Sequence, residues 1–156
     1  MHALKIRAAA VTDAARMRAV HRDAVMILCT GYYTRRQVDG WLEAYDESMY
    51  LAGIANGSVW VVDDGDVQGF VEAVGDTVTK LFVRPARTMG GLGTALLEHA
   101  ISQISRAGYV RAYLEATPNS RVFYERRGFK VVGHGYSPQG KPAAKLEVVR
   151  MQRPIA

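Results

Sequence analysis

Apolar side chains recur three or four residues apart in several stretches, and this spacing predicts amphipathic helices. The first helix is capped by Thr12-Asp13 and stopped by Gly31, and Thr34 caps the next. Gly108 and Gly128 end two later helices, and Asn119 can cap the last of them. The predicted helices span residues 12–31, 34–42, 46–54, 91–108 and 119–128.

Shorter apolar runs bounded by turn residues predict strands. Asn56-Gly57 and Asp64-Gly65 are typical turn sequences, and Pro85 closes a strand. The predicted strands lie at residues 4–6, 59–62, 67–74, 78–83, 109–116, 129–132 and 146–151. The resulting order, βααα-βββ-αβ-αβ-β, predicts a single α/β (mixed α+β) domain over residues 1–156, with one mixed sheet and helices on both faces.

Composition narrows the class of protein but does not identify it. The chain has 156 residues and 49% hydrophobic content, which is sufficient for one core. Cys29 is the only cysteine, so a disulfide framework is excluded and a reducing, cytoplasmic setting is expected. The first residues contain no uninterrupted apolar stretch, so we expect neither a secretory signal nor a membrane span.

The net charge of +5 conceals two halves of opposite sign. Residues 1–79 carry a net charge of −4, whereas residues 80–156 carry +9. The basic half suits a polyanionic cofactor, and because its basic residues are scattered singly apart from Arg126-Arg127, we do not expect a nucleic acid partner.

A glycine-rich turn, Gly90-Gly91-Leu92-Gly93, joins a predicted strand to a predicted helix. Exposed backbone N–H groups at such a junction can bind phosphate oxygens at the helix N-terminus. A P-loop would require Lys and then Ser or Thr after the last glycine, and Thr94-Ala95 stands there instead. A dinucleotide fingerprint would require a glycine at Leu96. On this turn alone, a structural role and an anion-binding role both stay open.

A second segment, Asn119-Ser-Arg-Val-Phe-Tyr-Glu-Arg-Arg-Gly-Phe129, follows about 30 residues later. The two segments together resemble the Gcn5-related N-acetyltransferase (GNAT) superfamily. The resemblance implies an acyl-CoA N-acyltransferase fold, with a central mixed, mostly antiparallel sheet of about six to seven strands. It also implies transfer of acetyl from the thioester of acetyl-CoA directly to an amine, without a metal. A catalytically silent acetyl-CoA sensor or regulatory module is the alternative.

The resemblance assigns cofactor contacts to both segments. The strand backbone would hold the pantetheine arm, the glycine turn would hold the pyrophosphate, and Asn119 would contact the arm or serve only as a helix cap. The loop departs from the family pattern at Thr88, where Arg or Gln is usual, and at Met89, where glycine is common. Arg87 is one position early and is expected to replace a lost contact. The implied cofactor residues are Leu81, Phe82, Val83, Arg87, Thr88, Met89, Gly90, Gly91, Leu92, Gly93, Thr94, Asn119, Phe123 and Tyr124.

Two residues are the candidates for proton transfer. Within the motif, Tyr124 is the expected general acid, because a phenol with a pKa near 10 stays protonated at neutral pH; the alternative is a core aromatic. Glu72 lies on the strand next to the cofactor strand, where related enzymes often carry a carboxylate. Alternation puts it on one face with Phe70 and Val74. An acid among apolar neighbours can accept an ammonium proton through water, although a solvated strand carboxylate is the competing reading.

The acceptor amine is expected to bind near the first helices. Candidate substrate-binding residues are Cys29, Tyr32, Tyr33, Trp41 and His134. Ordinary packing of the helical pair is the alternative for the aromatic residues. The four histidines lack metal-ligand spacing, so no metal site is expected. Dimers are frequent in such families, which leaves a homodimer open.

Overall fold

The computed structural model describes residues 5–28, 31, 33–44, 46–85, 91–137 and 146–155. Helices and strands follow the order predicted from the sequence. The strands are β1 (Lys5–Ala8), β2 (Val59–Asp63), β3 (Val67–Val74), β4 (Thr77–Val83), β5 (Arg111–Ala116), β6 (Lys130–Ser137) and β7 (Leu146–Pro154). The helices are α1 (Ala14–Leu28), α2 (Arg35–Ala44), α3 (Ser48–Ala55), α4 (Leu92–Arg106) and α5 (Arg121–Glu125), with 3-10 turns at Val11–Asp13 and Pro118–Ser120.

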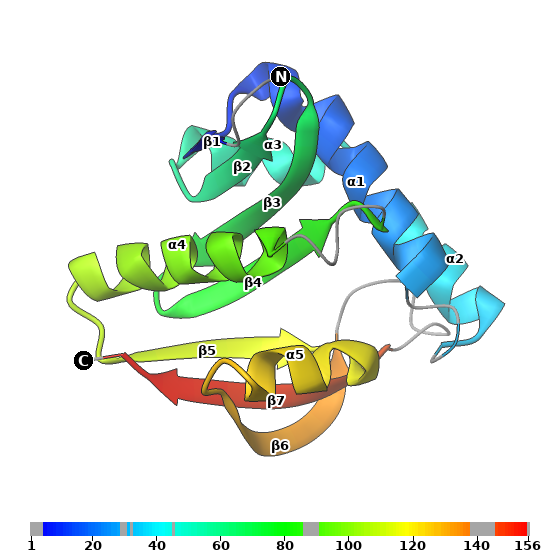
Figure 1. Cartoon of the computed structure of the whole chain (residues 1–156). Helices are drawn as coiled ribbons and strands as arrows, with labels where there is room; N and C mark the ends of the chain where they lie inside the picture. The colour runs from blue at the N-terminus through cyan, green and yellow to red at the C-terminus, as the bar shows by residue number, and fades with distance from the viewer. Residues whose placement is uncertain are drawn as a thin grey trace.

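Within the described ranges, seven strands form one sheet in the order β1-β2-β3-β4-β5-β7-β6 (Figure 1). β4 and β5 run parallel, and each of the other neighbouring pairs is antiparallel. The mixed, mostly antiparallel sheet expected from the sequence is therefore confirmed.

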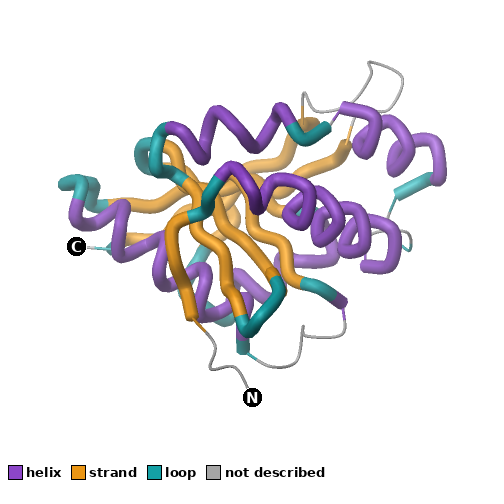
Figure 2. The backbone as a smooth tube through the Cα atoms, turned by 90° about the horizontal axis from the view of Figure 1, so that it is seen from above, coloured by secondary structure: helices purple, strands orange, loops and turns teal. Residues whose placement is uncertain are grey.

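Helices cover both faces of this sheet, as the view in Figure 2 shows. The buried face of α4, including Leu96 and Leu97, packs with residues of β3, β4, β5 and β7 in the larger core cluster. On the opposite face, Met17 and Val20 of α1 and Tyr50 of α3 pack against Phe70 of β3. The predicted layers are thus present, and β4 lies at the centre of the sheet with a helix on each side.

Local side-chain chemistry explains where two of the helices begin. The Thr34 side chain accepts a hydrogen bond from the Gln37 N–H (3.1 Å), and the Gln37 side chain accepts one from the Thr34 N–H (2.9 Å). This reciprocal pair is a capping box for α2, and it confirms the predicted cap. Asp13 ends a 3-10 turn before α1, where its carboxylate accepts the Ala10 N–H (2.7 Å) and pairs with Arg7 (2.8 Å).

Candidate functional site

The two parallel strands at the centre of the sheet separate soon after they begin. β4 pairs with β5 only through Thr77 with Tyr113 and Val78 with Leu114. β3 accompanies β4 along its whole length, up to Val83. Figure 1 shows β4 and β5 diverging toward their carboxyl ends, next to the start of α4.

A β-bulge lies at the point where the pairing with β5 stops. Glu72 of β3 is opposite Lys80, whereas the next residue, Ala73, is opposite Val78, so that Thr79 is an extra residue in β4. An extra residue bends its strand and increases the local twist. The bulge therefore coincides with the separation of β4 from β5.

Beyond the bulge, β4 has backbone groups on the side where it no longer pairs with β5. The Arg84 N–H donates to the Gln68 carbonyl of β3 at 2.8 Å. Along a strand, the backbone N–H and C=O groups of successive residues point to alternate neighbouring strands. The backbone groups of Phe82 therefore also point to β3, while those of Leu81 and Val83 point to the β5 side. In the part of the chain that the structure describes, β5 does not pair with them. An extended ligand can therefore bind this edge as an added strand would.

The described part of the glycine turn begins at Gly91, which has a φ of +78° and leads directly into α4. Gly93, in the first turn of α4, lies against the ring of Phe123: a Cβ at this position would be 3.2 Å from the ring. Glycine at this position therefore lets the helix approach the second motif closely. Arg87, Thr88, Met89 and Gly90 lie outside the described residues.

Arg127 joins the two motifs and was not a candidate in the sequence. Its Nε donates to Thr94 Oγ1 and its Nη1 to the Phe123 carbonyl, both at 2.7 Å. Its guanidinium carbon is 3.7 Å from the centre of the Phe123 ring, a cation–π contact. The sequence gives no reason to choose between the adjacent Arg126 and Arg127, and only the tertiary contacts distinguish them.

Tyr124 is buried in α5, in the core cluster beneath α4. Its ring meets Phe123 and Phe129 edge to face, with centroids 5.1 and 5.8 Å apart. Burial raises the pKa of the Tyr124 phenol above its usual value, so the group stays protonated at neutral pH. Asn119 lies within the preceding 3-10 turn and does not occupy the N-cap position of α5.

Glu72 lies on the opposite face of the sheet from Tyr124. A Cβ on Gly53 of α3 would overlap its Oε2, which places the carboxylate against α3. Its Oε1 accepts hydrogen bonds from Thr79 Oγ1 (2.6 Å) and Lys80 Nζ (2.7 Å). Glu72 is only 6% exposed, so it is a buried, paired carboxylate and the solvated reading is wrong.

An aromatic cluster that includes a buried histidine packs on the same face. The His21 ring stacks on Phe82 at a centroid distance of 4.0 Å, and its Nδ1 lies 2.7 Å from the Tyr50 hydroxyl. Burial and the nearby charge of Lys80 lower the pKa of His21 to about 3, so the ring is neutral at physiological pH. The sequence showed His21 only as a histidine without metal-ligand spacing.

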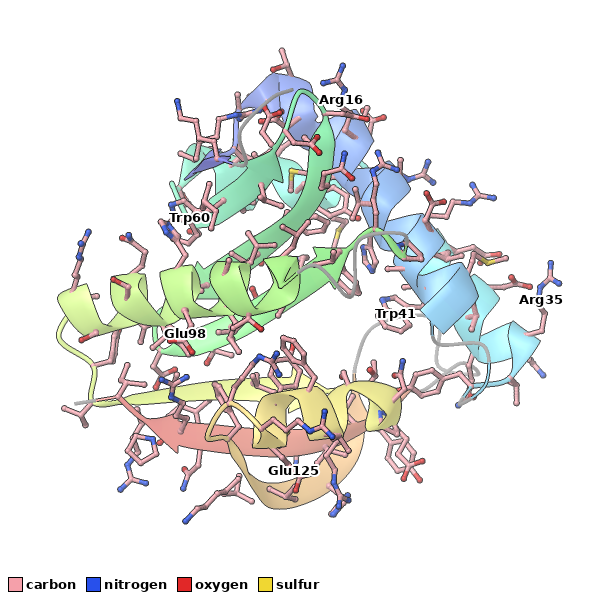
Figure 3. All side chains as sticks on the ribbon, viewed as in Figure 1. Arg16, Arg35, Trp41, Trp60, Glu98 and Glu125 are labelled. Carbon is pink, nitrogen blue, oxygen red and sulfur yellow. The ribbon has the colours of Figure 1, made fainter. Side chains whose placement is uncertain are left out.

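The predicted acceptor-binding residues do not all come together. Trp41, labelled in Figure 3, and Tyr33 are buried, with Trp41 edge-on to the Phe82 ring at 6.2 Å. The Tyr33 hydroxyl donates to the Glu147 carbonyl at the start of β7. His134 is exposed on β6, and β5 and β7 separate it from β4. Cys29 and Tyr32 lie outside the described residues.

Comparisons with known proteins agree with this geometry. Residues 55–131 match the model of the acetyltransferase (GNAT) domain. The uncharacterized N-acetyltransferase YafP of Escherichia coli K12 is 28% identical over 133 residues, which is 85% of each chain.

Two solved structures share the fold over nearly the whole chain. One is a GCN5-related N-acetyltransferase (Aminotransferase, Class-II) from Rhodopseudomonas palustris, with a TM-score of 0.88 and 21% identity, covering 99% of this chain and 96% of that one. The other is the PaiA N-acetyltransferase from Thermoplasma acidophilum in complex with coenzyme A, with a TM-score of 0.79 and 19% identity, covering 97% and 99%. Residues 55–131 therefore match a GNAT acetyltransferase domain, and the chain as a whole has the fold of these solved N-acetyltransferases.

The described ranges lack both a membrane-spanning helix and a cluster of metal ligands. No helix there is long and apolar enough to cross a bilayer. No three His, Cys, Asp or Glu side chains in those ranges are grouped as ligands of a metal ion would be.

Proposed function

We propose that this protein transfers an acetyl group from acetyl-CoA directly to the amine of an unidentified acceptor. The edge of β4 that Leu81 and Val83 present beside the first turn of α4 is the observation that carries the proposal. The backbone groups of this edge can hydrogen-bond the amides of the pantetheine arm, and the N-terminus of α4 can bind the phosphates. A backbone N–H of this strand, once bonded to the thioester carbonyl, would stabilise negative charge developing on its oxygen.

The two candidate proton-transfer groups approach β4 from opposite faces of the sheet. Tyr124 lies on the α4 face, where its protonated phenol can give a proton to the departing thiolate. Glu72 lies on the α3 face, where a carboxylate can take the proton of an incoming ammonium group. This separation suits direct transfer, because one group can take a proton from the incoming amine while the other gives a proton to the departing thiolate.

The contacts of Glu72 set a condition on its role as a base. Lys80 and Thr79 both bind Oε1 of this carboxylate. Because that oxygen is already engaged, Glu72 would act through a water that is also in contact with the amine. A Glu72→Gln variant that keeps the wild-type pH–rate profile would place the base elsewhere.

The test is a panel of primary amines, polyamines and peptide amines, each incubated with acetyl-CoA while free thiol is followed. Amine-dependent thiol release that requires the protein is the expected result. Binding of acetyl-CoA without turnover across the panel would favour the silent sensor. No binding of acetyl-CoA at all would refute both functions.

A further inference from the structure

Arg127 is held rigidly in place by groups of the candidate cofactor site itself. Its hydrogen bond to Thr94 reaches the first turn of α4, and its bond to the Phe123 carbonyl reaches α5. The cation–π contact with the Phe123 ring restricts the guanidinium further. The cation is therefore oriented before any ligand binds, which reduces the entropy lost on binding.

The charge of Arg127 is not balanced by a neighbouring acid. Among the described residues, no carboxylate forms an ion pair with it, and the hydrogen bonds that its Nε and Nη1 donate go to neutral oxygens. Three other arginines of this half do have an acidic partner: Arg121 pairs with Glu125, Arg150 with Glu115, and Arg153 with Glu98. A half-buried guanidinium without a counter-charge is suited to an anionic ligand.

The glycine turn itself is poor in basic side chains. Thr88 stands where the family pattern has Arg or Gln, and Arg87 is one position early. A cation outside the turn can therefore supply the side-chain contact that Thr88 lacks.

We infer that Arg127 supplies this cation and binds a phosphate group of coenzyme A through its Nη2 edge. The inference rests on the proposed function. Nε and one N–H of Nη1 already donate to the protein, so both N–H groups of Nη2 and the second N–H of Nη1 are the remaining donors. Arg127 is thus a specificity residue for the nucleotide end of the cofactor and takes no part in proton transfer.

The experiment compares Arg127→Gln with Arg126→Gln in the full-length chain. The two substitutions remove the same charge from adjacent positions, and Arg126 is exposed to solvent. Dissociation constants for coenzyme A and for 3′-dephospho-coenzyme A are measured by calorimetry at low and at high salt. A lost charge-assisted hydrogen bond should weaken coenzyme A binding by about tenfold or more in Arg127→Gln. Arg126→Gln should stay within about twofold, because it removes only a screened surface charge.

Salt dependence distinguishes a phosphate contact from a structural role. If Arg127 binds phosphate, the affinity of Arg127→Gln will fall less steeply with salt than that of the wild type. Arg127→Lys should recover part of the affinity, because it keeps the charge without the fork. If Arg127→Gln also weakens the binding of 3′-dephospho-coenzyme A, the contact is with the diphosphate. If it weakens only the binding of coenzyme A, the contact is with the 3′-phosphate.

Three results would overturn the inference: unchanged affinity in Arg127→Gln, equal losses in both variants, or a loss with an unchanged salt slope. Wild-type protein that binds no coenzyme A at all would instead refute the proposed function. The two failures are therefore distinguishable.

Discussion

Removing the Glu72 carboxylate should destabilise the protein strongly, because it would take the negative charge away from a buried ammonium group, that of Lys80. The Lys80 Nζ is 2.7 Å from Glu72 Oε1, and the two side chains are 12% and 8% exposed. The informative substitution is Glu72→Gln, which preserves the shape and an acceptor oxygen while removing the negative charge.

The size of the expected loss of stability follows from the distance between the two charges and from their burial. At 2.7 Å, the attraction is about 6 kcal/mol for an effective dielectric constant of about 20. Desolvation of both charges offsets much of this attraction, but when only Glu72 is neutralised the desolvation cost of the Lys80 ammonium remains. Breaking a buried pair on one side therefore costs about 3 to 5 kcal/mol. We expect Glu72→Gln near the lower limit, because its amide oxygen still accepts hydrogen bonds from Thr79 and Lys80.

Urea unfolding of Glu72→Gln, Lys80→Met and the double variant provides the assay. The double variant should be less destabilised than the sum of the single variants, since it leaves no unpaired charge. The control is Asp39→Asn, which removes an exposed i,i+4 pair with Arg35 (79% and 51% exposed for Arg35 and Asp39) and should cost less than about 0.5 kcal/mol. A loss below about 1 kcal/mol in Glu72→Gln would show that the carboxylate is solvated, and would refute the reasoning.

Three further outcomes are expected. Tyr124→Phe should lower turnover tenfold or more and keep cofactor affinity within a few-fold, measured by thiol release and calorimetry; unchanged turnover would exclude the general acid. Burial depresses the pKa of His21 from 6.5 to about 3, so between pH 6.5 and about pH 3 only the unfolded state is protonated at this residue. The free energy of unfolding should therefore decrease as the pH is lowered below 6.5, by at most about 1.4 kcal/mol per pH unit. His21→Phe should flatten that part of the urea-unfolding profile, and an unaltered profile would show that the folded histidine titrates normally. Gly69→Ala should lower the free energy of unfolding by about 1 to 3 kcal/mol, because the new Cβ would be 2.9 Å from the Phe82 carbonyl oxygen of β4. An unchanged free energy of unfolding would mean that β4 can move away without cost.

Periodicity predicted most of the sheet. The third strand was predicted at residues 67–74, and β3 has these bounds. The alternation placed Glu72 on the same face as Phe70, and both residues do contact α3. The C-terminal strands extend further than predicted. β6 reaches Ser137 because it pairs there with the start of β7, and β7 reaches Pro154 because it pairs there with β5. Cross-strand pairing of this kind depends on the partner strand and is not a property of either sequence alone.

The site residues were harder to predict because their chemistry depends on contacts between distant segments. The Glu72–Lys80 pair depends on the register between β3 and β4, which the extra residue Thr79 shifts. Arg127 is separated from Thr94 by 33 residues, and no local pattern indicates that it contacts α4. His21 is buried by Phe82 and Tyr50, which belong to other elements. The sequence could identify the two motifs, but not the charged groups that connect them.

The bulge at Thr79 links the two halves of the proposed chemistry. As an extra residue, it accompanies the end of β4–β5 pairing, so that Leu81 presents its backbone to a ligand instead of to β5. Its hydroxyl, on the same residue, donates to the Glu72 carboxylate. A single irregularity of one strand thus creates the binding edge and orients the nearest acid on the opposite face. The position of Glu72 and the position of a ligand on β4 are therefore set together, and a change in the bulge would alter both.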